Sequence, residues 1–467
     1  MLGLQGNRSI KACRRSFLGF ALLAVLALSA QTQSVQDAVA AAVQEIQAGQ
    51  FQKANDSVQS ALRAHPEAVE LWNLLGISNT ELHRGKTARR AFERGLQIAP
   101  NSVSLNENIG FLFFREANYG PAKRYLRRAV DLGSDHPGVR FSLAAAELRT
   151  GEQAKALKEL KQLEAPLSEA SSYWVERGTA DLAQNDPEAE ASFARALQLD
   201  PNDLAALNGA ASAAEKDGLD EKALAFLIKA REGHPSDVPT LLHFGTVCLR
   251  RDLGLDALDA AKKAYNLSPG NNYALYLLAR ANISQQNWQR SYELFAQLSQ
   301  RLPNYAPAYY AMGWLDVKLD KTDDAKRQLE HCLALDPGLF DARAQLAQLH
   351  LENGDLDAAQ QLFEKVLQQD PRNAKANSGM GALLLRKGRL DEAQHYLEAA
   401  IAADPKDGAP HYKLSQVLLR KHDTVRADKE RALALALNSQ AERASKAPLR
   451  LALPDGNSLP QELHETK

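Results

Sequence analysis

Apolar and small residues recur along most of the chain with the spacing of two alternating helices. In a 34-residue frame, places 4, 7, 8 and 11 hold apolar or small residues, as at Tyr309, Met312 and Gly313. This i, i+3, i+4, i+7 spacing lies on one helical face. A second segment holds Ala at place 20, a large residue at 24 and a small one at 27, as at Ala393 and Leu397. The pattern predicts two amphipathic helices per unit, packed closely through the small residues at places 8 and 20.

Proline sets the length of the unit. From Pro201 to Pro405, seven prolines follow one another at intervals of 34 residues. Proline disfavours helical geometry in the residue before it and is a good opening residue for a helix, so each one separates two units. With proline at place 32, the units begin at Val35, Val69, Val103, Pro137, Ser171, Leu204, Val238, Asn272, Ala306, Phe340, Ala374 and Gly408. Only the unit at Ser171 is one residue shorter, in the turn around Asn185.

The unit from Val69 resembles the tetratricopeptide repeat family. It has the W-x2-L-G pattern at Trp72 to Gly76, the A-x3-F pattern at Ala88 to Phe92, and the closing Pro100. The resemblance covers residues 35–441 and implies an all-α fold, a right-handed superhelical solenoid of antiparallel helix pairs. Within a solenoid at 31–441 we expect eleven clear units and a degenerate capping unit at 408–441. Residues 442–467, with three prolines and few large apolar residues, are expected to be a disordered tail.

The first thirty residues have the pattern of an export signal. Arg8, Lys11, Arg14 and Arg15 precede a 12-residue apolar run that begins at Phe17, and small residues follow it. A basic start, a short apolar core and a small-residue exit are typical of a secretory signal, here 1–30. The pair Arg14 and Arg15 resembles a twin-arginine signal, and an ordinary signal stays open as the alternative. We therefore expect an exported protein, periplasmic or extracellular, or a membrane-tethered one if the signal is retained.

Composition and charge narrow the function classes. The formal net charge of -1 becomes -5 when residues 1–30 are removed, because they carry four basic residues and no acidic one. This charge argues against a nucleic-acid partner. Cys248 and Cys332 fall at core places of distant units, where we expect buried thiols and no disulfide between them.

Motifs for catalysis, cofactors and metals are missing from the sequence. Arg84 to Thr87 ends like a phosphate-binding loop, but Thr80 stands where that loop requires glycine. There is no H-E-x-x-H or C-x-x-C pattern. We expect no enzyme activity, no cofactor and no metal site.

Places 2, 5, 9 and 12–13 form another face of each first helix, and in the resembling family this face lines a concave groove. Two adjacent units concentrate aromatic and basic residues there, although aromatic residues are only 6% of the chain. Tyr, Trp and Arg are enriched in binding hot spots. The candidate partner-binding residues are Leu242, Arg250, Tyr273, Tyr276, Arg280, Tyr310, Trp314 and Lys318, with a weaker second patch at Phe111, Phe114 and Arg115.

These observations predict a non-enzymatic scaffold that binds a peptide or protein segment in its groove. The alternatives are an envelope assembly, secretion or polysaccharide-export subunit that binds glycan or machinery, and a membrane-tethered adaptor. For the aromatic residues themselves, the alternative is that the rings fill the seam between helices.

Overall fold

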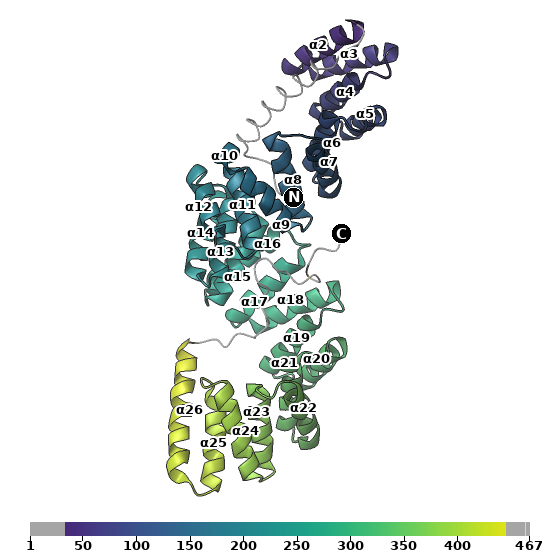
Figure 1. Cartoon of the computed structure of the whole chain (residues 1–467). Coiled ribbons are helices and arrows are strands. Elements are labelled where there is room, and N and C mark those ends of the chain that lie inside the picture. The colour runs from purple at the N-terminus through teal and green to yellow at the C-terminus, as the bar shows by residue number, and fades with distance from the viewer. Residues whose placement is uncertain (1–32, 445–462, 464–467) are drawn as a thin grey trace. The chain divides into compact units, whose positions relative to one another are not determined.

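The computed structural model describes residues 33–444 and residue 463 (Figure 1). The expected export signal lies outside the described residues, as does the expected tail apart from Leu463 and its first three residues. The described part contains helices and turns and no strand, which confirms the all-α fold class. Within it, no helix combines the length and the apolar character that a membrane crossing requires.

Contacts divide the chain into unit 1, residues 1–233, and unit 2, residues 234–467. In both units the helices stack as consecutive antiparallel pairs (Figure 1). The helices of unit 1 are α2 (Gln33–Gln47), α3 (Phe51–Ala64), α4 (Val69–Glu81), α5 (Gly85–Ile98), α6 (Val103–Arg115), α7 (Tyr119–Asp131), α8 (Pro137–Arg149), α9 (Gln153–Gln162), α10 (Glu164–Leu167), α11 (Ser171–Ala183), α12 (Ala189–Leu199), α13 (Leu204–Lys216) and α14 (Asp220–Gly233).

Unit 2 continues the same alternation. Its helices are α15 (Val238–Arg250), α16 (Gly254–Leu267), α17 (Asn272–Ser284), α18 (Trp288–Arg301), α19 (Ala306–Lys318), α20 (Thr322–Leu335), α21 (Phe340–Glu352), α22 (Leu356–Gln369), α23 (Ala374–Arg386), α24 (Leu390–Ala403), α25 (Gly408–Arg420) and α26 (Thr424–Ala444).

The first helix of eleven successive repeats begins at the residue where the 34-residue frame begins, from α4 at Val69 to α25 at Gly408. Side-chain caps explain several of these starts. Asp203, Asp237 and Asn271 each accept a hydrogen bond from the backbone N–H three residues further on, which satisfies a donor that the first helical turn leaves unpaired. The repeat at α2 starts slightly earlier, at Gln33.

The turn within each repeat needs one residue with a left-handed backbone, at place 15. Glycine holds it in five repeats, for example Gly151, where φ is +81°. Other residues hold it elsewhere, such as Ala117 with φ of 55° and Asp252 with φ of 57°. A Cβ makes this conformation costly, so these repeats contain a small built-in strain.

Close helix packing at place 8 confirms the role expected for small residues there. A Cβ added to Gly76 would lie 2.2 Å from the Phe92 ring carbon Cε1. In the same way, a Cβ on Gly313 would come within 2.8 Å of Leu329 Cγ. The large residue at place 24 therefore packs directly on the backbone of the first helix in its own repeat.

Place 11 differs from its expected apolar or small character. Five repeats bury a polar residue there, and these residues are Asn79, Glu147, Asp181, Asn282 and Asp316. Both asparagines donate to a carbonyl one turn earlier in their own helix, at 2.8 Å. A buried polar group costs free energy unless it is hydrogen-bonded, so the three carboxylates need partners from elsewhere.

Helix α26 is the last described helix of unit 2. Its outer face is less polar than the face that usually ends a repeat stack. Its early residues include the exposed Arg426 and Lys429. Val425 and Leu435, however, are 82% and 65% exposed. The end of the stack therefore leaves apolar side chains in contact with solvent.

Candidate functional site

The eight candidate residues of unit 2 lie on three successive first helices. Leu242 and Arg250 belong to α15, the next three to α17, and the last three to α19. We call the surface formed by Leu242, Arg250, Tyr273, Tyr276, Arg280, Tyr310, Trp314 and Lys318 the first-helix face. None of the eight residues is acidic.

A hydrogen bond and ring stacking link α15 to α17. The hydroxyl groups of Thr246 and Tyr273 lie 2.6 Å apart. The Tyr273 and Tyr276 rings stack with centroids 6.1 Å apart, and Arg280 Nη1 donates to the Tyr276 hydroxyl at 3.2 Å. The structure thus brings together three of the candidate residues and adds Thr246, which is not among the residues predicted from the sequence.

Burial fixes the chemistry of this cluster. Burial raises the pKa of Tyr273 to about 12, although the hydrogen bond with Thr246 acts to lower it. Burial also raises the pKa of Tyr276. Both phenols therefore remain protonated at neutral pH and act as hydrogen-bond donors or acceptors. The Tyr276 ring also meets Phe295 of α18 edge-on at 6.0 Å between centroids, so it packs within its own repeat.

Helix α19 presents a second, more open cluster. The Trp314 ring lies edge-on to Trp288 of α18 with centroids 5.6 Å apart. Lys318 is exposed, and its Nζ lies 5.2 Å from the centroid of the Trp314 ring. Tyr310 is buried, and burial raises the pKa of its phenol. This cluster combines a cation, a half-buried indole and a second indole from the neighbouring helix.

The aromatic side chains are therefore more buried than an open binding surface would require. Tyr276 and Tyr310 are 1% and 3% exposed, and Tyr273 is buried as well. The contact between Tyr276 and Phe295 agrees with the alternative interpretation, in which the rings fill the seam between helices. Binding of a partner by the first-helix face stays a prediction. Phe295 and Trp288 lie on the second helix α18, so the first-helix pattern of the sequence does not contain them.

Asp316 lies beside this face and has an unusual environment. It is 1% exposed, and neither carboxylate oxygen has a hydrogen-bond partner among the described residues. Burial raises the pKa of Asp316 to about 6, and the nearby Asp324 acts in the same direction. The side chains of Lys321 and Arg327 act in the opposite direction, but they do not bond to the carboxylate. Unit 2 therefore holds a buried carboxyl group whose pKa is raised toward neutral pH.

The weaker patch lies in unit 1 on α6. Phe114 meets Tyr119 edge-on with centroids 5.6 Å apart, and Phe111 packs against the apolar core. Arg115 Nη1 forms an ion pair with Glu81 Oε1 at 3.0 Å. The two phenylalanines are half-buried, so this patch offers less apolar surface than its sequence suggests. Its role as a binding surface stays a prediction.

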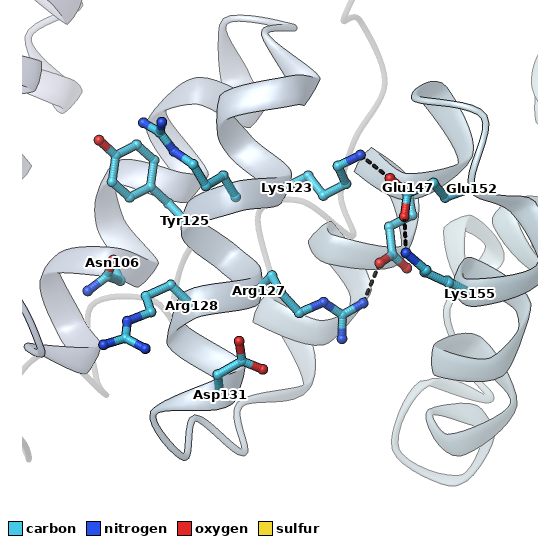
Figure 2. Close-up of a pocket in the computed structure, with 10 residues that line it drawn as sticks. Asn106, Lys123, Tyr125, Arg127, Arg128, Asp131, Glu147, Glu152 and Lys155 are labelled. Carbon is cyan, nitrogen blue, oxygen red and sulfur yellow. Dashed lines mark hydrogen bonds and ion pairs between the residues drawn. The ribbon is translucent and has the colours of Figure 1, made fainter.

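A pocket of about 530 Å³ opens in unit 1 between α6, α7, α8 and the start of α9 (Figure 2). Its charged side chains largely pair with one another: Lys123 and Lys155 donate to Glu152, and Arg127 donates to the buried Glu147. Hydrogen bonds from the two lysines lower the pKa of Glu152 to about 2. We interpret the pocket as the site of an ion-pair network between repeats.

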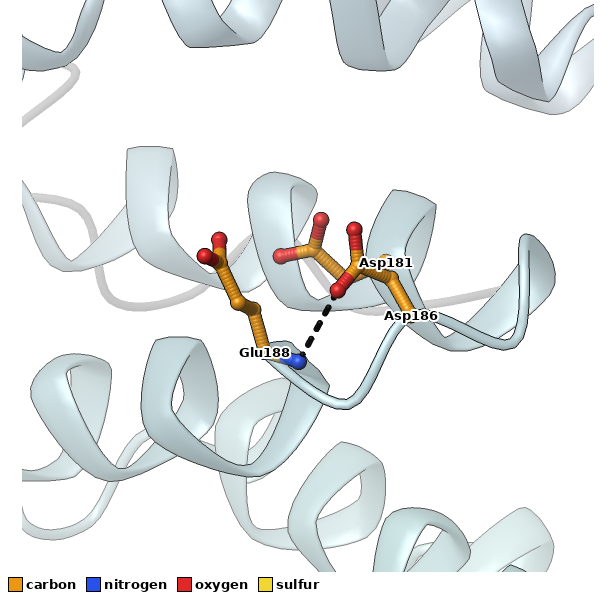
Figure 3. A group of neighbouring side chains, drawn as sticks. All are labelled: Asp181, Asp186 and Glu188. Atoms are coloured by element: carbon orange, nitrogen blue, oxygen red, sulfur yellow. Dashed lines mark hydrogen bonds between the residues drawn. The ribbon is translucent and has the colours of Figure 1, made fainter.

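Three carboxylates of unit 1 lie close enough together to hold a cation. Oxygen atoms of Asp181, Asp186 and Glu188 lie within 4.8 Å of one another (Figure 3). Arg177 already lies against this group, because its Nε donates to Asp181 at 3.1 Å and its Nη2 to Glu188 at 2.7 Å. The guanidinium thus supplies the positive charge that a metal ion would supply.

Comparisons with known proteins agree with the repeat architecture. Models of the tetratricopeptide repeat match residues 39–103 and 175–238, residues 273–305, and residues 317–383 and 350–418. Anaphase-promoting complex subunit 3 of Schizosaccharomyces pombe is 29% identical over 116 residues, which are 25% of this chain and 17% of that protein. Protein O-mannosyl-transferase TMTC3 of Homo sapiens is 25% identical over 330 residues, which are 66% and 36% of the two chains. The chain thus spans well under half of either relative.

Two solved structures are similar to this chain. The APC/C hetero-tetramer Cut9-Hcn1 aligns over 94% of both chains with 14% identity and a TM-score of 0.44. A tetratricopeptide repeat protein from Parabacteroides merdae aligns over 51% of this chain and 95% of its own, with 18% identity and a TM-score of 0.45.

Proposed function

Since this chain is a protein-interaction scaffold built from tetratricopeptide repeats, we propose that its first-helix face in unit 2 binds a peptide or protein segment. The protein would act without a chemical step, after export from the cytoplasm. The observation that carries this proposal is the row of basic and aromatic side chains on α15, α17 and α19, ending in the exposed Lys318 over the Trp314 ring.

The chemistry of this face favours an extended acidic or aromatic segment. Arg250, Arg280 and Lys318 give it positive charge, and Trp314 offers a half-buried indole. Cation–π and aromatic contacts at partly desolvated positions contribute about 0.5–2 kcal/mol each. A binding surface assembled across repeats would add several such contacts.

The test compares binding to a peptide array and to a glycan array. The wild-type chain is compared with a Trp314→Ala, Lys318→Glu double variant and with a Lys262→Glu control, whose exposed lysine lies on the second helix α16. We expect selective binding to acidic peptides, lost at least tenfold in the double variant and kept in the control, with unchanged helical circular dichroism. Equal binding by all three chains, or binding to glycans alone, would contradict the proposal. N-terminal sequencing of the exported protein tests the signal at 1–30.

A further inference from the structure

Three successive second helices of unit 1 are strongly basic. Helix α5 carries four basic residues and one acidic residue, α7 carries the same numbers, and α9 carries three basic residues and one acidic residue. In the other second helices that the structure describes, basic residues outnumber acidic ones by at most one. Positive charge is therefore concentrated on three repeats of a chain whose formal net charge is only -1.

One cation recurs at the same place in these three repeats. Arg90, Arg124 and Lys158 follow one another at intervals of 34 residues and hold place 22 of the frame. All three side chains are exposed, and none of them has an ion-pair partner within the described residues. Equivalent places of stacked repeats lie in a row, so the three cations form one line across α5, α7 and α9. We call Arg90, Arg124 and Lys158 the cation row.

The acidic residues of these helices leave the cation row without a counter-charge. Glu159 follows Lys158 directly but pairs with Arg127 Nη1 at 2.9 Å. Glu93 of α5 and Asp131 of α7 are exposed, and neither forms an ion pair in the part of the chain that is described. The basic side chains therefore remain in excess and available to a partner.

Charged residues at place 22 of unit 2 behave differently. Asp259 holds this place on α16 and pairs with Lys263 Nζ at 2.9 Å, one turn further along the helix. Arg327 holds it on α20 and pairs with Asp324 of the same helix. Pairing within one turn can thus neutralise a charge at this place, and the cation row lacks such pairs.

A hollow lies beside the middle cation of the row. The pocket of about 530 Å³ in unit 1 is lined by Arg124 and Arg128 of α7, among other residues. Arg124 Cζ lies 4.7 Å from the centroid of the Tyr125 ring, and Arg128 Nη2 donates to Asn101 Oδ1 at 2.6 Å. Neither neighbour is charged, so both guanidinium groups are held in place while their charge stays uncompensated. The hollow can therefore accept an anionic group.

The spacing of the cation row fits a protein segment better than a nucleic acid. A helix with its side chains is about 10–12 Å across, so cations on successive second helices lie about 10 Å apart or more. An extended chain advances ~3.3 Å per residue, so acidic residues three or four positions apart match this spacing. Duplex DNA carries one charge per ~1.7 Å, which is far denser than the row.

A membrane surface fits less well because this part of unit 1 offers no apolar side chain for insertion. Among the described residues, the exposed large apolar side chains begin at Leu219, beyond α5, α7 and α9. Attachment to a bilayer depends on buried apolar area as well as on charge. The observations favour a partner that is bound by its carboxylates.

We propose that the cation row and the hollow beside Arg124 form a second docking surface, which binds an extended acidic segment of another protein. This surface lies on second helices of unit 1, so it goes beyond the first-helix face of unit 2 and does not depend on it. A single exposed ion pair contributes little, so binding arises from several charges of one segment acting together.

The experiment uses the full chain with Trp314→Ala and Lys318→Glu, so that binding at the first-helix face does not contribute. The probe is a fluorescent peptide that repeats Glu-Ser-Gly four times, and fluorescence anisotropy measures its Kd. We expect Arg90→Glu, Arg124→Glu and Lys158→Glu together to weaken binding at least tenfold, because the row then repels the carboxylates.

A matched control reverses three exposed lysines on other second helices. These are Lys229 of α14, Lys262 of α16 and Lys365 of α22, and none has an ion-pair partner within the described residues. The control changes the net charge by the same amount and should weaken binding less than twofold. Equal weakening by the two triple variants, or no peptide binding by the parent chain, would overturn the proposal.

Two further probes test the other anionic partners. These are a single-stranded oligonucleotide and vesicles of phosphatidylserine and phosphatidylcholine. If either probe binds through the cation row and the peptide does not, the assignment to a protein segment is wrong. Since the parent chain already carries the changes at Trp314 and Lys318, failure of the first-helix face in the peptide array leaves these results unchanged, and the two proposals fail separately.

Discussion

Asp181 of unit 1 and Asp316 of unit 2 occupy the same place in their repeats, and both are buried, yet their surroundings differ. Asp181 accepts hydrogen bonds from Arg177 Nε at 3.1 Å and from Ser192 Oγ at 2.9 Å. Asp316 has no partner on either oxygen within the part of the chain that is described. One repeat position thus tolerates a buried carboxylate in two ways, as an ion pair and as a group that can take up a proton.

The difference extends to the neighbouring charges. Around Asp181, Arg177 is itself buried and also bonds to Glu188, so the charges form a closed group. Around Asp316, Tyr292 of α18 and the residues Lys321, Asp324 and Arg327 face the carboxyl group. Lys321 lies over the Tyr292 ring, and Arg327 pairs with Asp324. The cations near Asp316 are therefore engaged elsewhere.

The largest expected effect comes from Asp181→Asn. The substitution keeps the shape of the side chain but leaves the buried Arg177 with less compensating charge, and removal of one partner of a buried pair costs about 3–5 kcal/mol. We expect the free energy of unfolding to fall by about 3 kcal/mol, near the lower limit, because Glu188 still pairs with Arg177. Urea unfolding followed through Trp174, which lies in the same helix α11, measures it. Replacing the other three tryptophans by phenylalanine isolates the signal. An unchanged midpoint would show that the pair is not needed for stability.

Above neutral pH, Asp316→Asn should raise the free energy of unfolding, whereas Asp181→Asn lowers it. Burial raises the pKa of the folded carboxyl group to about 6 from 3.8, so the folded state binds the proton more tightly than the unfolded state does. Its favourable contribution is complete below about pH 4 and is lost as pH rises through 6.

We therefore expect Asp316→Asn to stabilise the protein by about 1–2 kcal/mol at pH 8 and to change little at pH 4.5. Urea unfolding at both values, followed through Trp314 in the same helix α19, makes the measurement. A stabilisation that is equal at the two pH values would contradict the assigned protonation.

The smallest expected effect concerns the left-handed residue at place 15. Ala117→Gly should stabilise unit 1 by about 1 kcal/mol, because glycine adopts the φ of 55° without a Cβ clash. Gly151→Ala, at the same place of the next repeat, should cost a similar amount. Thermal unfolding of the two variants measures both effects as shifts in Tm. Shifts of the same sign would contradict the interpretation of these turns.

Sequence alone predicts the repeat architecture because it depends on local and periodic features. Proline spacing fixes the frame, and Asp203 and Asn271 cap helices at the expected starts. Position 76 requires a small residue such as glycine because the Phe92 ring packs on it. Each of these effects acts within one repeat or at the boundary between two successive repeats, where the pattern of residues can be followed directly.

The candidate site is less predictable because it depends on what covers each residue. The frame assigns Tyr276 and Tyr412 to equivalent places but cannot tell that one is 1% and the other 49% exposed. Likewise, it assigns Asp181 and Asp316 to the core without showing that only one of them meets an arginine. The contacts of Trp288 and Phe295 come from second helices, which no first-helix pattern contains.

Cross-linking of a bound peptide tests the central claim most directly. An acidic peptide that the array selects, carrying a photoreactive benzophenone group, is irradiated with the full chain, and the adducts are located by mass spectrometry. The account predicts adducts on the first helices α15, α17 and α19. Adducts mainly on the second helices α16, α18 and α20, or no adduct at all, would contradict it.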